Sequence, residues 1–187
     1  MAAALRVVAE KGLAGASTRA IVAEADMALA SFHYAFESRD QLLERLVAEV
    51  LQSEEKAVVP TAIGGRSLTE LIRDSLLGYL SHLRSDPAHE QAMLELTQYA
   101  VRSGLPLARQ QYEHYTRIAL ASLELAAEHT GHAWSVPLPT VAALLISLTD
   151  GLTLTWLVSR DDAAAEALID AAATAVASLA VTQPEER

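Results

Sequence analysis

Three consecutive polar residues near the start of the chain, Ser17, Thr18 and Arg19, carry groups that can bind phosphate. Serine and threonine are common helix N-caps, and the first turn of a helix has backbone N–H groups without an intrahelical partner. Hydroxyls and amides at such a position can hold a nucleic-acid phosphate. The Arg19 guanidinium could reach a guanine edge with two hydrogen bonds, or a phosphate. Each residue alone also fits a structural role, as a cap or as an exposed side chain.

Residues typical of catalytic or metal sites are scarce. The chain has no cysteine, which excludes disulfides, thiolate-bound metals and a cysteine nucleophile. Asp161, Asp162 and Glu166 resemble an aspartate-rich magnesium motif, but no second such motif is present and helix capping explains them better. His129 and His132 fit the end of a surface helix better than a metal site. We therefore predict no metal site, no cofactor and no enzymatic activity.

The charge distribution points to one end of the chain for phosphate binding. The 187 residues include 14 basic and 24 acidic ones, a net charge of −10. Residues 1–36 contain three basic and three acidic residues, so the full negative charge lies in the remainder. A surface that meets a polyanion is therefore expected at the N-terminal end.

The longest apolar stretch, from Val141 to Val158, is about long enough to span a membrane but has Asp150 near its middle. An aspartate at that depth costs ~2.5–3.5 kcal/mol on insertion scales, which favours a buried core or interface helix. The first residues contain Arg6, Glu10 and Lys11, where a signal peptide would be apolar. We predict a cytoplasmic protein without membrane contact.

The elements that must position these side chains are predicted to be helices only. The 36 alanines and the absence of apolar/polar alternation favour an all-α fold. Capping patterns mark four helix starts, at Ser38, Ser67, Asp86 and Asp161. About nine helices are expected, at residues 2–11, 17–25, 28–34, 38–58, 68–83, 88–103, 107–130, 139–159 and 163–181. A linker is predicted at 59–66.

The first three predicted helices form a helix-turn-helix arrangement. Gly12 is a C-cap glycine that ends the first helix, and Ser17 begins the second. Asp26 occupies the tight turn before the third helix, which is too short to be stable without its neighbours. Two short helices joined by such a turn, with a supporting helix before them, are typical of this DNA-binding unit.

This segment resembles the DNA-binding domain of the TetR family of bacterial transcriptional regulators. The positions that match the family pattern are Gly12, Ser17, Thr18, Ile21, Ala25, Ser31, Phe36, Ser38, Leu42 and Leu43, with Arg39 and Asp40 as similar replacements. The positions that depart from it are Val22, Asp26, Ala28, His33 and Ala35. The match begins inside the family's first helix, so a longer natural N-terminus is expected.

The resemblance implies that the third helix is the recognition helix, which lies in the major groove of double-stranded DNA. Ser31 and Tyr34 are expected at phosphates, His33 at a base edge or a phosphate, and Arg39 at a phosphate, whereas Phe32 and Phe36 are expected in the core. The full set of predicted DNA-binding residues is Ser17, Thr18, Arg19, Ala28, Leu29, Ser31, His33, Tyr34 and Arg39.

The resemblance also implies a DNA-binding domain at 1–45 and a helical ligand-binding and dimerisation domain at 46–187. Polar and aromatic residues among mainly apolar helices could line an effector pocket, although most could equally be ordinary half-buried positions. The predicted ligand-binding residues are Tyr79, Glu95, Tyr99, Tyr112, Tyr115 and Trp156.

The last two helices carry few charges and many small or branched apolar residues, a surface that a monomer would expose. We predict an isologous homodimer interface there, formed as a four-helix bundle from two subunits. Its predicted residues are Leu148, Leu152, Leu168, Ala172, Ala175 and Leu179.

The sequence thus predicts a ligand-responsive transcriptional regulator. The expected mechanism is a repressor that binds a palindromic operator as a dimer and is released by a small, largely apolar effector. One alternative is a helical ligand-binding or scaffold protein with a degenerate DNA-binding end. Another is an all-α lyase or cyclase, for which the sequence offers no metal ligands.

Overall fold

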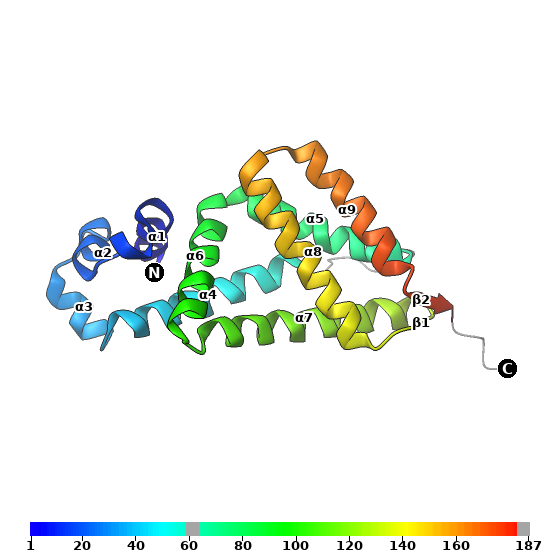
Figure 1. Cartoon of the computed structure of the whole chain (residues 1–187), viewed down its shortest axis with the longest axis horizontal. Coiled ribbons are helices and arrows are strands. Elements are labelled where there is room, and N and C mark those ends of the chain that lie inside the picture. Colours follow the sequence, from blue (N-terminus) through cyan, green and yellow to red (C-terminus); the bar gives the residue numbers. More distant parts are fainter. Residues whose placement is uncertain (59–63, 183–187) are drawn as a thin grey trace. The chain divides into compact units, whose positions relative to one another are not determined.

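The computed structural model describes residues 1–58 and 64–182, and the side chains of 1–49 and 64–182. Residues 59–63 of the predicted linker lie outside the described part. Within it are nine helices and two short strands (Figure 1): α1 Ala2–Gly15, α2 Thr18–Glu24, α3 Leu29–Ala35, α4 Arg39–Val58, α5 Leu68–Ser85, α6 Pro87–Ser103, α7 Leu107–His129, β1 His132–Trp134, α8 Leu138–Ser159, α9 Asp162–Ala177 and β2 Ala180–Thr182. The fold is nearly all-α, as predicted.

The chain divides into two compact units, each with its own packing. Unit 1 comprises Met1–Ser53 and Ser85–Tyr112, and unit 2 comprises Glu54–Arg84 and Glu113–Arg187. The predicted domain boundary after residue 45 lies inside unit 1. Unit 1 also contains part of the region after residue 45, because α6 packs against α1. The predicted domain boundary stays a prediction.

Unit 1 is built on the packing of α1, α4 and α6. Ala4, Val7 and Val8 of α1 are buried, as are Leu42, Leu43, Leu46 and Val47 of α4 and Ala92, Met93, Leu96 and Ala100 of α6. The predicted end of the first helix at Gly12 is confirmed, because Gly12 has φ 66° and ψ 170° inside α1. Residues 13–15 form a further turn beyond this kink.

Unit 2 encloses an apolar core between α5, α7, α8 and α9. Leu80 and Leu83 of α5 and Val141 and Ala142 of α8 are fully buried, and Ile169 of α9 is 1% exposed. By length and composition alone, α8 is the one helix in the described part of the chain that could cross a membrane. It buries Leu152 and Trp156 in this core, as expected of a core or interface helix.

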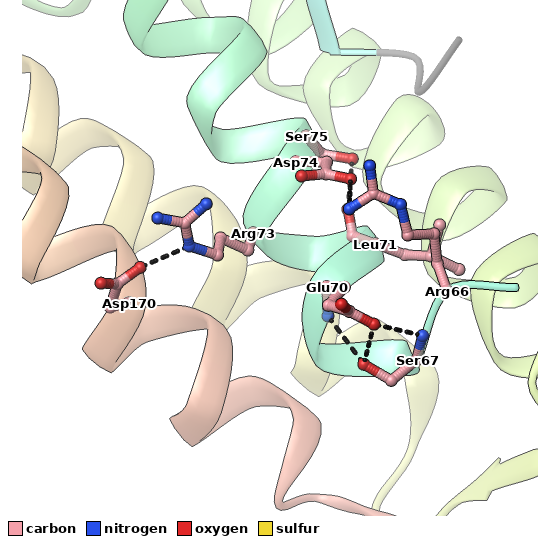
Figure 2. A network of polar contacts seen from close by, with 8 residues as sticks. All are labelled: Arg66, Ser67, Glu70, Leu71, Arg73, Asp74, Ser75 and Asp170. Atoms are coloured by element: carbon pink, nitrogen blue, oxygen red, sulfur yellow. Dashed lines mark hydrogen bonds and ion pairs between the residues drawn. The ribbon is translucent and has the colours of Figure 1, made fainter. Parts of the chain in front are cut away.

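Ion pairs fasten α9 to α5 at the rim of that core. Arg73 Nε lies 2.6 Å from Asp170 Oδ1 (Figure 2), and Arg84 contacts both Asp162 and Glu166, at 2.9 and 2.8 Å. The hydrogen bond from Trp156 Nε1, with help from Arg84, lowers the pKa of Asp162 below its ordinary value of 3.8. These contacts orient α9 without contributing much burial, because the charged groups are exposed.

The predicted capping residues mostly act as expected. Figure 2 shows the Ser67–Glu70 capping box, in which Ser67 N donates to Glu70 Oε2 at 2.8 Å and Glu70 N donates to Ser67 Oγ at 3.3 Å. The Ser67 backbone N–H, then its hydroxyl, lowers the pKa of Glu70. Asp86 and Asp161 accept from His89 N and Ala164 N. At Ser38 the box is incomplete, because Gln41 Oε1 accepts from Glu37 N instead.

The predicted helix at 163–181 is too long at its C-terminal end. α9 ends at Ala177, and Ala180–Thr182 pairs as an antiparallel strand with His132–Trp134. Ser135 N and Oγ also donate to Leu179 O, at 2.8 and 2.6 Å. This long-range pairing competes successfully with the helix propensity of the final residues.

Candidate nucleic-acid interface

α2 and α3 form the predicted helix-turn-helix arrangement within unit 1. The turn between them passes through Asp26, which has φ 52°, a conformation that aspartate tolerates better than most residues. Met27 N donates to Val22 O at 2.9 Å and closes the turn. Ile21 and Val22 are buried, so α2 is held by its apolar side.

A single aromatic side chain attaches α3 to unit 1. Phe32 is the buried residue of this helix, as predicted, and its ring lies 5.4 Å from that of Phe36. The guanidinium carbon of Arg45 on α4 lies 5.5 Å from the centre of the Phe36 ring. A helix of seven residues is not stable alone, so this aromatic contact determines the position of α3.

The rest of α3 faces solvent. Tyr34 is 96% exposed, and Leu29 and His33 are also exposed, whereas Ser31 is partly buried. Ala28 precedes the helix as an exposed N-cap without a side-chain hydrogen bond. Leu29–Ala35 contains no carboxylate. An exposed helix with His and Tyr outward and no negative charge is chemically able to approach DNA.

The polar residues at the start of α2, the helix before α3, are accessible to solvent. Ser17 Oγ accepts from Ala20 N at 3.2 Å, which makes Ser17 the N-cap and leaves its hydroxyl proton available to a phosphate. Arg19 is exposed and Thr18 is half-buried. Arg6 of α1 forms an ion pair with Glu24 of α2 at 2.8 Å, so the negative charge of this carboxylate is neutralised by a neighbouring arginine.

Arg39 does not extend toward solvent as a phosphate ligand would. Its Nε donates to Ala16 O at 3.0 Å and its Nη2 donates to Leu13 O. Leu13 lies in the last turn of α1 and Ala16 is its C-cap residue, so the guanidinium caps the end of this helix. These two donors are engaged within the chain, and the predicted phosphate contact of Arg39 stays a prediction.

Glu95 is likewise engaged in unit 1. Its Oε1 accepts from Leu13 N at 2.7 Å. One carboxylate oxygen therefore binds the backbone of α1, and the expectation that Glu95 lines an effector pocket stays a prediction.

The other predicted ligand-binding residues are divided between the units. In unit 2, Tyr79 Oη lies 2.7 Å from Thr153 Oγ1, and Trp156 Nε1 donates to Asp162 Oδ1 at 2.7 Å while Arg160 covers its ring at 4.6 Å. Tyr79 and Trp156 thus have structural partners in the core. Tyr99 and Tyr112 lie in unit 1 and Tyr115 in unit 2, all partly accessible; their role stays a prediction.

The predicted dimer residues also separate into two groups. Leu152 and Ala172 are buried in the core of their own chain, and Leu148 and Leu179 pack partly against it. Leu179 moreover lies beyond the end of α9. Only Leu168 and Ala175 are exposed, because the face of α9 that enters the core is Ala165–Ile169–Ala172–Val176. Other large apolar residues of α8 that are exposed are Leu144, Leu154 and Val158.

Comparisons with known proteins found one family model and several similar regulators. Residues 1–46 match the family model described as bacterial regulatory proteins, tetR family. A curated relative, the HTH-type nicotine-responsive transcriptional repressor HdnoR of Paenarthrobacter nicotinovorans, is 26% identical over 162 residues, which cover 86% of this chain and 82% of that protein.

Solved structures share the fold over nearly the whole chain. A transcriptional regulator from Rhodococcus sp. RHA1 has a TM-score of 0.80 at 20% identity, covering 98% of this chain and 96% of that one. The multidrug binding protein EbrR, solved with imidazole, has a TM-score of 0.60 at 25% identity, covering 98% and 94%. With the helix-turn-helix geometry of α2 and α3, these similarities identify residues 1–46 as a DNA-binding segment of the tetR type and make the whole chain similar to transcriptional regulators.

Proposed function

We propose that this regulator is a repressor that binds an approximately palindromic operator as a homodimer and is released by a small, largely apolar organic molecule. The proposal includes a cytoplasmic location and no catalytic role, as is usual in this family. The main support for the proposal is the surface of α3, which is exposed and has no carboxylate, while Phe32 of the same helix is buried in the protein.

Readout of DNA is assigned to His33 and Tyr34 on α3, with Ser17, Thr18 and Arg19 on α2 at phosphates. His33 offers ring nitrogens to a base edge or a phosphate, and the almost fully exposed Tyr34 offers a hydroxyl to a phosphate. Arg39 is left out of this set because its guanidinium is bound to backbone carbonyls.

The variant His33→Ala/Tyr34→Ala tests the assignment. Operator binding in a gel-shift titration should fall at least about thirtyfold, since two good contacts are worth roughly 1–3 kcal/mol each. The control is Leu125→Ala/His129→Ala, which removes two exposed side chains from α7. Equal affinities for both variants, with unchanged helicity, would refute α3 as the reading helix.

A homodimer is supported by apolar residues that a monomer leaves in water. Leu144, Leu154 and Val158 of α8 are 38%, 57% and 79% exposed, and Leu168 of α9 is 37% exposed. Two such helix pairs facing each other would bury these side chains in an isologous interface. Sedimentation of Leu154→Glu/Val158→Glu should show a monomer; an unchanged dimer would reject this face.

The class of effector is suggested by the relatives. HdnoR is named as nicotine-responsive, and EbrR as a multidrug binding protein solved with imidazole. Small nitrogen heterocycles such as nicotine and imidazole are therefore the first probes. Because linkage is reciprocal, a releasing ligand must bind the operator complex more weakly by the same factor by which it weakens DNA binding. Calorimetric titration with and without operator measures this factor, and identical affinities would exclude release by that compound.

A further inference from the structure

The peptide group of Leu13 is held by two charged side chains from different helices. On one side, Leu13 N donates to Glu95 Oε1 of α6 at 2.7 Å. On the other, Leu13 O accepts from Arg39 Nη2 of α4, whose Nε also donates to Ala16 O at 3.0 Å. We call this arrangement of Glu95, Leu13, Ala16 and Arg39 the Leu13 clamp. All four residues lie in unit 1.

Gly12 makes the clamp possible. Its φ of 66° and ψ of 170° lie in a region that is almost restricted to glycine, and they turn the Leu13 N–H out of the helical direction. A Cβ at Gly12 would lie 2.8 Å from Glu95 Oε1, so the carboxylate approaches where only glycine leaves room. The kink in the backbone and the close approach of Glu95 thus both require glycine at position 12.

The clamp acts on the segment that leads into α2. Leu13 and Ala16 are buried, at 4% and 0% exposure, and Ala16 is followed directly by Ser17, the N-cap of α2. The direction in which α2 starts therefore depends on the backbone that Glu95 and Arg39 hold. Hydrogen bonds to charged partners are stronger than neutral ones, which suits them to fix a short connecting segment.

We propose that Glu95 and Arg39 are positioning residues for DNA binding: they set the start of α2, and so the placement of Ser17, Thr18 and α3 against the duplex, without touching DNA. The proposal rests on the DNA-binding function proposed above. In this proposal Arg39 positions the backbone and is not a phosphate ligand. A phosphate ligand would contribute ~0.9 to the slope of log affinity against log salt concentration.

The test is a double-mutant cycle on operator affinity, measured over a range of salt concentrations. Glu95→Met and Arg39→Met remove the two sides of the clamp at similar side-chain length. Each should weaken binding by about tenfold, and the double variant should be little weaker than the worse single one, because both act through the same backbone. Glu95→Gln retains an acceptor oxygen and should bind within about twofold of the natural protein.

A control separates positioning from general loss of stability. Thr97→Val, also on α6, removes hydroxyl hydrogen bonds to Met93 O and Gln111 Oε1 but does not touch Leu13. It should lower the melting temperature while operator affinity stays within about twofold. If Thr97→Val weakens DNA binding as much as Glu95→Met, the effect is one of stability and the proposal is wrong.

Two further results would overturn it. One is multiplication of the single effects in the double variant, which would mean independent roles. The other is a salt slope lowered by ~0.9 in Arg39→Met alone, which would make Arg39 a phosphate ligand. Hydrogen exchange of the Leu13 amide, faster in Glu95→Met but not in Glu95→Gln, tests the clamp without DNA. This readout distinguishes failure of the clamp from failure of the DNA-binding function.

Discussion

α3 and α9 are attached to their units in opposite ways. α9 buries Ala165, Ile169, Ala172, Ala173 and Val176 against the unit 2 core and adds ion pairs to α5. α3 buries Phe32 alone and leaves its other face in water. The segments before α3 are held by polar bonds to backbone atoms, at Leu13, Ala16 and Ala20.

The contrast follows from what each region must do. A helix that reads DNA has to keep its outer surface free, so it gives up burial and relies on a few directed contacts. A helix in a folded body can use its apolar residues for stability. Changes in unit 2 should therefore act mainly on unfolding free energy, whereas changes around α1–α3 should act more strongly on operator affinity.

The largest effect on stability is expected for the apolar residues by which α9 packs against the core of unit 2. Ile169→Ala should lower the free energy of unfolding by about 2–5 kcal/mol, because the side chain is 1% exposed and its removal leaves a cavity. Urea denaturation followed by circular dichroism measures it. Thr174→Ala on the exposed side of α9 should stay within about 0.5 kcal/mol; a similar loss in both would contradict the packing described for α9.

Gly12→Ala should disrupt the polar contacts around Leu13. The left-handed backbone costs about 1–3 kcal/mol for a residue with a Cβ, and the methyl group would also push against the Glu95 carboxylate. Operator affinity and unfolding free energy should both fall. Gly104→Ala is the matched control, since Gly104 also has positive φ (65°) but open space around it. Only Gly12→Ala should weaken DNA binding beyond its effect on stability; an equal loss in Gly104→Ala would contradict a specific role for Gly12.

Ser17 allows folding and binding to be separated at one position. Ser17→Ala removes the acceptor of Ala20 N and should cost about 1 kcal/mol of stability together with some operator affinity. Ser17→Asp retains an N-cap acceptor and should keep the stability, yet its charge repels phosphate, so operator affinity should fall further than in Ser17→Ala. Thermal melts and gel shifts measure the two quantities. Tighter DNA binding by the aspartate variant would remove Ser17 from the phosphate-contacting surface.

The same contrast explains which features could be predicted from the sequence. Local signals identified the helix-turn-helix segment, because Gly12, Ser17 and Asp26 each encode a backbone conformation through their own chemistry. The core position of Phe32 was likewise expected, and the side chain is buried. Both kinds of signal depend on residues close together in the chain.

Long-range partners were not predictable in this way. The bond from Leu13 to Glu95 joins residues 82 positions apart, and no local pattern marks either of them. Arg39 has the charge expected of a phosphate ligand, but its orientation depends on where α1 ends in space. On α9, alanines occur on every face, so periodicity does not decide which face enters the core. Ala172, expected at the dimer interface, is buried in its own chain, as is Leu152 of α8.

The smallest expected effect concerns the charged rim of unit 2. Because the pKa of Asp162 is lowered by Trp156 Nε1 and Arg84, its carboxylate favours the folded state above its ordinary value of 3.8, and that contribution is lost as pH falls through the lowered value. Glu70, whose pKa is lowered by Ser67, acts in the same direction from its ordinary value of 4.5.

Stability should therefore decline on acidification below about pH 4.5, and Asp162→Asn should reduce that decline because the variant cannot titrate. Melting temperatures between pH 3 and 7 measure this, with Asp161→Asn as the control, since Asp161 caps α9 without contacting Arg84 or Trp156 in the contacts described above. An Asp162→Asn profile as steep as that of the control would show that burial alone, without the rim, keeps α9 in place.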